Sequence, residues 1–133
     1  MTEGYSGKPL AEKLGVRDGD TLAVMDAPTA YASWVEPLPT GATLIDGPDP
    51  EARILHLFVR NRADLEHKMH AAFGHRPESG MVWVSWPKKS SKLFEDLTED
   101  GLREVILPTG WVDVKVCAVD ADWSGLKFVR RRA

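Results

Sequence analysis

Residues Gly80–Ser91 read GMVWVSWPKKSS, an apolar run that ends abruptly in proline, two lysines and two serines. The apolar part, Met81–Val84, has the composition of a strand that is buried on both faces, and the polar part has that of a loop at the edge of a sheet. In open α/β sheets, ligands bind where loops leave the carboxyl ends of strands. The stretch therefore predicts a buried strand and a place for a ligand beside it.

The rest of the chain is of ordinary globular composition. It has 133 residues, 43% of them hydrophobic and 28% charged, which suits one compact domain. We expect a single domain over residues 1–133, in which residues 1–8 form an N-terminal arm. The formal net charge of -3 argues against a dedicated nucleic-acid binder, which normally carries a basic excess.

The location predicted from the sequence is the cytoplasm. Cys117 is the one cysteine, so no disulfide can form within the chain, as expected in a reducing compartment. The N-terminus lacks the pattern of a secretory signal. No apolar run approaches the roughly 20 residues that a membrane helix needs.

Strand-like and helix-like segments alternate along the chain. Asn61 and Thr98 are expected to begin helices as N-caps, and Gly74 and Pro108 are expected to end them. Thr29 is expected to cap a shorter helix. The expected strands are residues 21–25, 42–45, 54–59, 81–85, 112–118 and 123–129, and the expected helices are residues 9–14, 29–35, 61–74 and 98–107.

This alternation predicts an α/β domain with a mostly parallel sheet of about six strands. The last two strands are joined by the tight turn Asp120–Asp122 and must be antiparallel. About seven residues separate the second and third strands, too few for a helix. These two strands are therefore either parallel, with the connection returning along the length of a short strand, or they form a hairpin.

The phrase LGVRDGD at Leu14–Asp20 and the antiparallel last strand resemble a class I methyltransferase fold from which part of the middle is missing. The resemblance implies a three-layer Rossmann-like domain whose first strand is followed by a glycine-rich, adenosylmethionine-binding turn. Here that turn is Asp26-Ala27-Pro28-Thr29. Without glycine, side chains obstruct the close approach of a cofactor to the backbone.

Longer phrases resemble the bacterial domain-of-unknown-function family 3052. They are GYSG at residues 4–7, WPKKSS at residues 86–91, DLTED at residues 96–100, and VDVKVCAVD with WSGLKF in the C-terminal region. This resemblance supports the fold and implies neither an activity nor catalytic residues.

In the parallel arrangement, the ends of the first, third and fourth strands and the last turn meet at one edge of the sheet. Two arginines and two lysines beside serines suit a phosphate or carboxylate. Tryptophans could stack on a planar ring, or could plug the end of the core instead. The candidate ligand-binding residues are Asp26, Arg60, Arg62, Trp86, Lys88, Lys89, Ser90, Ser91, Trp123 and Ser124.

Three functions remain open. The first is binding of an anionic small molecule or nucleotide, the second is an enzyme of methyltransferase ancestry, and the third is a module that binds a protein partner or a second copy of itself. The sequence indicates no particular cofactor and no catalytic residues. His67, His70 and His75 lack further ligands to complete a metal site, and His56 is expected to be a buried, hydrogen-bonded side chain.

Overall fold

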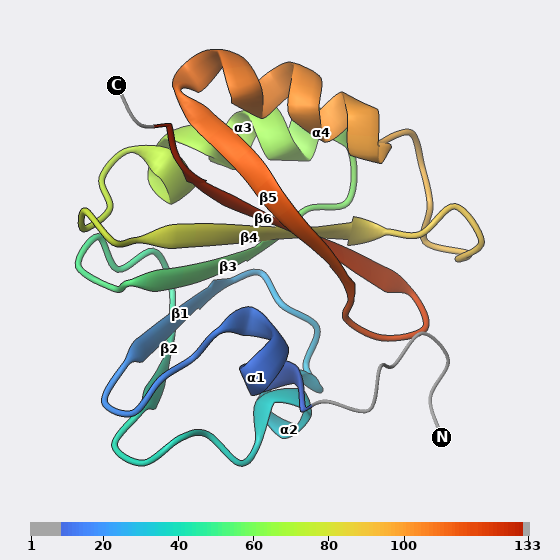
Figure 1. Ribbon diagram of the computed structural model, residues 1–133. Coiled ribbons are helices and arrows are strands. Elements are labelled where there is room, and N and C mark those ends of the chain that lie inside the picture. The colour runs from blue at the N-terminus through green and yellow to red at the C-terminus, as the bar shows by residue number, and fades with distance from the viewer. Residues whose placement is uncertain (1–8, 132–133) are drawn as a thin grey trace.

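The computed structural model of the protein describes residues 9–131, so the predicted N-terminal arm, residues 1–8, lies outside the described residues. One six-stranded sheet runs through the molecule in the order β2-β1-β3-β4-β6-β5 (Figure 1). The strands are β1 (Thr21–Met25), β2 (Thr43–Asp46), β3 (Ile54–Phe58), β4 (Met81–Pro87), β5 (Trp111–Ala118) and β6 (Trp123–Arg130). The predicted α/β, mostly parallel sheet is confirmed.

Helices cover both faces of the sheet, which gives the predicted three layers (Figure 1). Helices α3 (Arg62–Phe73) and α4 (Glu99–Ile106), the latter extended by the short helix η1 (Leu107–Thr109), pack on one face. Helices α1 (Leu10–Leu14) and α2 (Tyr31–Val35) pack on the other. Each face has its own apolar core, so the central strands β3 and β4 are buried along their whole length.

The sequence left open whether the second and third strands are parallel or form a hairpin. Strand β1 lies between them in the structure and answers this question. Strand β1 is parallel to β2 on one side and to β3 on the other. The two strands are therefore not a hairpin. The seven residues 47–53 span up to roughly 23 Å, which is enough to return along the four-residue β2.

The C-terminal strands complete the sheet in antiparallel fashion. Strand β6 lies between β4 and β5 and is antiparallel to both, and β5 forms the outer edge, as its alternating sequence predicts. The pairing of β5 with β6 is interrupted between Asp113 and Lys115. The side chains of Val114, at this bulge, and of Val116, just beyond it, are half exposed.

Local capping signals explain where the two long helices begin. The Asn61 side chain accepts a hydrogen bond from the Asp64 N–H at 2.7 Å, and Thr98 accepts one from the Gly101 N–H at 3.1 Å. Both predicted caps are confirmed. The predicted cap at Thr29 is wrong, because α2 begins after Ala30 without any side-chain cap. Within residues 9–131, no helix is long and apolar enough to cross a membrane.

Candidate ligand-binding site

The carboxyl ends of β1, β3 and β4 lie at one edge of the sheet because these strands are parallel neighbours. Strand β5 runs in the same direction, so the turn between β5 and β6 joins them there, with Trp123 paired to Pro87. We call this edge the rim. The strand directions thus place the predicted site residues of these segments at the rim.

A staple between two loops divides the rim. The backbone N–H of Lys88 donates to the Asp122 carbonyl at 2.8 Å, and the Ser91 hydroxyl donates to an Asp122 carboxylate oxygen at 2.8 Å. The loop after β4 is therefore fixed to the β5–β6 turn. One hollow lies on each side of this staple.

The first hollow has a volume of about 410 Å³ and lies where the strand order reverses. The chain passes from β1 outward to β2 in one direction and from β3 to β4 in the other, so β1 and β3 flank a topological switch point. We call it the switch-point hollow. Its lining residues are Asp26, Ala27, Pro28, Trp34, Arg60, Leu93, Asp120, Asp122 and Trp123.

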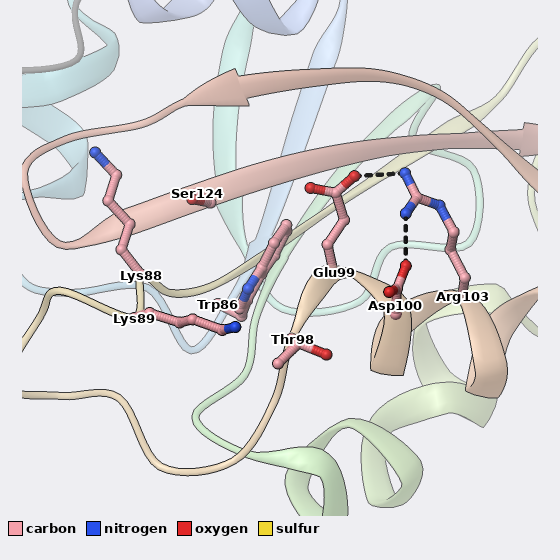
Figure 2. Close-up of a pocket in the computed structure, with 8 residues that line it drawn as sticks. All are labelled: Trp86, Lys88, Lys89, Thr98, Glu99, Asp100, Arg103 and Ser124. Carbon is pink, nitrogen blue, oxygen red and sulfur yellow. Dashed lines mark hydrogen bonds and ion pairs between the residues drawn. The ribbon is translucent and has the colours of Figure 1, made fainter.

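The second hollow has a volume of about 470 Å³ and lies on the α4 side of the rim (Figure 2). We call it the lysine hollow. Figure 2 shows Lys89 extending across it toward Trp86 and Thr98, whereas Lys88 extends away. Its lining residues are Trp86, Lys88, Lys89, Thr98, Glu99, Asp100, Arg103 and Ser124.

The predicted residues therefore do not enclose one common hollow. Asp26, Arg60 and Trp123 line the switch-point hollow, and Trp86, Lys88, Lys89 and Ser124 line the lysine hollow. The remaining three line neither of the two. Ser90 is an exposed loop residue, Ser91 forms the staple, and Arg62 binds Glu66 and Glu104 along helices α3 and α4.

The rim tryptophans differ in how much of their surface is free. Trp86 is 6% exposed and Trp123 is 8% exposed, so both mainly plug the ends of the two cores. Trp34, on α2, is less buried and lines the switch-point hollow. Sequence reasoning missed Trp34. Leu93, exposed by 49% in the loop after β4, was missed as well.

Asp26 closes the end of β1 in an unusual backbone conformation. Its φ is 61°, in the left-handed region that glycine adopts most easily. Its carboxylate pairs with the Lys68 ammonium at 2.8 Å, and Lys68 also donates to Asp64 at 3.0 Å and to the Phe58 carbonyl at 3.2 Å. The turn after β1 is thus tied to helix α3 across the end of β3.

Acidic groups outnumber basic ones in the switch-point hollow. Its three aspartates face one arginine, Arg60, which forms no ion pair with any residue in the range 9–131. Asp120 accepts hydrogen bonds from the N–H groups of Asp122 and Trp123 at 2.8 and 2.9 Å, so its carboxylate is held in place. A ligand here would meet one free guanidinium and fixed carboxylates.

The charges of the lysine hollow are arranged differently. Arg103 binds Glu99, Asp100 and Asp113, so one guanidinium holds three carboxylates. The hydrogen bonds that Arg103 donates to Glu99, and then to Asp113, raise the pKa of Arg103. Within the described part of the chain, Lys89 pairs with none of these acids.

A chain of polar side chains lies buried between α2 and the strands β3 and β4. The Tyr31 hydroxyl lies 2.8 Å from His56 Nδ1, and His56 Nε2 lies 2.7 Å from the Ser85 hydroxyl. Burial lowers the pKa of His56 to about 3 and raises the pKa of Tyr31 above its ordinary value. The prediction that His56 is a buried, hydrogen-bonded side chain is confirmed.

No protein-family model and no curated protein matches the sequence. The resemblance to family 3052 therefore stays a prediction. Solved structures do match over nearly the whole chain.

An O-methyltransferase family 2 protein from Planctomyces limnophilus, in complex with apigenin, has a TM-score of 0.63 at 15% identity. The match covers 98% of this chain and 54% of that protein, so this chain spans about half of its length. The fold is methyltransferase-like. A SAM-dependent methyltransferase from Aquifex aeolicus gives a TM-score of 0.63 at 8% identity, covering 95% of this chain and 90% of that one. The DhpI–SAH complex gives 0.62 at 11% identity, covering 94% and 83% respectively.

Proposed function

We propose that this methyltransferase-like domain binds a nucleoside-type small molecule with one anionic group in the switch-point hollow. The observation that carries the proposal is the position of the hollow. It lies at the carboxyl ends of β1 and β3, where the strand order reverses, and residues that follow both strands line it. Ligands of open α/β sheets bind at this point.

The lining groups define the kind of ligand. Trp34 offers an aromatic face for a planar base, and Arg60 offers a free guanidinium for a carboxylate or phosphate. The carboxylates of Asp120 and Asp122 can accept hydrogen bonds from sugar hydroxyls. Lys68 neutralises Asp26, but no ion pair among residues 9–131 neutralises Asp120 or Asp122, so repulsion from these two disfavours a ligand with several negative charges.

A zwitterionic adenosyl amino acid fits these groups better than a nucleoside triphosphate. The structural neighbour solved as a complex with SAH (S-adenosylhomocysteine) supports the choice of that compound as the first probe. Methyl transfer is the second candidate function, and the fold comparisons favour it. The turn at Asp26–Thr29, which has no glycine, argues against it.

The proposal is tested by isothermal titration of SAH, AMP and ATP into the purified protein. We expect SAH or AMP to bind at least tenfold more tightly than ATP. Trp34→Ala and Arg60→Ala should each weaken binding roughly tenfold, equivalent to about 1.4 kcal/mol. The double variant Lys88→Ala/Lys89→Ala in the other hollow is the matched control and should bind as the wild type does.

Each of the other outcomes has a clear meaning. Loss of binding only in Lys88→Ala/Lys89→Ala would move the predicted anion site to the lysine hollow, together with Trp86 and Ser124, and would overturn the proposal. An absence of binding by the wild type would also overturn it and would favour the interaction module. Methyl transfer from S-adenosylmethionine to an acceptor would establish the second candidate.

A further inference from the structure

Helix α2 carries Trp34 to the switch-point hollow but has little to hold it in place. It is five residues long, Tyr31–Val35, and has no side-chain cap. So short a helix is not stable by its own hydrogen bonds. Its position must come from contacts with α1 and with the sheet, in which Tyr31 and Val35 are buried.

Tyr31 is the first residue of α2 and is 3% exposed. Its hydroxyl bonds to His56 on β3, and the other ring nitrogen of His56 bonds to Ser85 on β4, at 2.8 and 2.7 Å. Three elements are thus joined by two hydrogen bonds inside an apolar core. We call these three residues the buried relay.

Each ring nitrogen of His56 in the relay needs a partner of the right kind, a donor for one and an acceptor for the other. Because burial lowers the pKa of His56 to about 3, the imidazole is neutral near neutral pH, so one nitrogen donates and the other accepts. A neutral imidazole that lost a partner in this core would leave a polar atom unpaired, which is unfavourable. The relay therefore fixes the hydroxyl of Tyr31, and with it the start of α2, relative to β3.

The same tyrosine contacts the tryptophan of the hollow. The rings of Tyr31 and Trp34 are 6.1 Å apart, centre to centre, at an interplanar angle of 65°. They lie three residues apart, on one side of the helix. A rotation of α2 that released Tyr31 from His56 would move Trp34 in the hollow.

We propose that Tyr31 is a positioning residue, which, through its own hydrogen bond to His56, sets the orientation of Trp34 in the switch-point hollow. The part that concerns ligand affinity rests on the proposed function. The part that concerns the orientation of Trp34 does not, and it can be measured without any ligand.

The chain offers a closely matched pair of variants. Tyr31→Phe and Ser85→Ala each remove one hydroxyl from His56, and each leaves one buried ring nitrogen without its partner. Both should therefore lower the midpoint of urea denaturation by similar amounts. Only Tyr31 is part of α2, so only Tyr31→Phe should alter the setting of Trp34.

The readout is fluorine NMR of protein labelled with 5-fluorotryptophan, whose five signals are assigned by single tryptophan-to-phenylalanine variants. We expect Tyr31→Phe to shift or broaden the Trp34 signal and Ser85→Ala to leave it unchanged. With SAH as the probe, Tyr31→Phe should weaken binding roughly three- to tenfold, and Ser85→Ala less than twofold.

Equal changes of the Trp34 signal in both variants, or no change in either, would overturn the proposal. If the wild type binds no SAH, AMP or ATP but the Trp34 signal responds as expected, the proposed function fails and the positioning role stands. If Tyr31→Phe does not fold, Trp34→Phe supplies the reciprocal test. It should shift the imidazole nitrogen signals of His56, and unchanged signals would reject the coupling.

Discussion

The two hollows at the rim have similar volumes, about 410 and 470 Å³, but different origins. The switch-point hollow exists because the connections that follow the neighbouring parallel strands β1 and β3 lead to opposite sides of the sheet. The lysine hollow exists because a hairpin and the first turn of α4 stand apart beside the end of β4. The comparison shows that strand order alone can create a candidate binding site, even where no local sequence motif indicates one.

The most conspicuous phrase, WPKKSS, leads to the lysine hollow instead. Its two lysines look like an anion site, yet Lys88 extends away from the hollow and Lys89 extends toward Trp86 and Thr98 (Figure 2). The nearby acids Glu99 and Asp100 are already bound to Arg103. The guanidinium of Arg60, by contrast, stands unpaired among the described residues of the switch-point hollow. Three further experiments test how far the two hollows differ.

The largest expected effect concerns the tryptophans. Because Trp86 and Trp123 are almost fully buried, each beneath a different hollow, Trp86→Ala and Trp123→Ala should each lower the free energy of unfolding by roughly 3–5 kcal/mol. Trp34→Ala should cost only about 1–2 kcal/mol, since part of that ring is exposed. Urea denaturation gives all three values. A cost for Trp123→Ala no larger than that for Trp34→Ala would mean that Trp123 is also available to a ligand.

A smaller effect is expected at Asp26. Alanine in a left-handed conformation is unfavourable, and the pair with Lys68 is lost, so Asp26→Ala should lower the free energy of unfolding by about 1–2 kcal/mol. Asp26→Gly removes the same pair but fits the backbone, so it should be less destabilising than Asp26→Ala. Asp100→Ala, at an exposed acid of the lysine hollow, is the control and should change little. A larger loss in Asp26→Gly than in Asp26→Ala would contradict the steric argument.

The smallest effect distinguishes the N-terminal ends of the helices beside the two hollows, Asp64 in the first turn of α3 and the cap Thr98 of α4, by their dependence on pH. Burial raises the pKa of Asp64, but hydrogen bonds from the Arg60 N–H and from Lys68 outweigh it and leave the pKa below its ordinary value of 3.8. The contribution of Asp64 to stability is therefore present above pH 3.8 and is lost as the pH falls through the lowered pKa. The hydroxyl cap of Thr98 does not titrate.

We therefore expect Asp64→Asn to lower the free energy of unfolding by about 1 kcal/mol at pH 7 and to approach the wild type in acid. Thr98→Ala should cost about 1 kcal/mol at both pH values. Urea denaturation at pH 7 and at pH 3 makes the comparison. A cost of Asp64→Asn that persists unchanged at low pH would show that its hydrogen bonds do not depend on the charge.

Much of the fold could be predicted from the sequence because its signals are local. The caps at Asn61 and Thr98 each act over three residues, and the apolar run at Met81–Val84 marks a strand without reference to the rest of the chain. The antiparallel last pair follows from the short turn between its strands. Whether β2 and β3 pair could not be decided, because the answer depends on β1 lying between them.

The candidate site was predicted less well because it depends on contacts between distant segments. The staple joins Lys88 to Asp122, 34 positions apart, and no local pattern announces it. Trp34 reaches the hollow only through a five-residue helix that the sheet holds. Arg62 was placed at the rim although Glu66, four residues on, is a natural partner along a helix, and this spacing was a signal that could have been used.

The bulge in β5 has a consequence for molecules that meet at this edge. An outer strand of eight residues exposes a ladder of backbone groups to which a strand of another molecule could add. The irregularity at Asp113–Lys115 divides that ladder into two short pieces, and Lys115 adds a charge between the half-exposed valines. We therefore expect this edge to be a poor template for a strand of another molecule, although two of its valines are half exposed.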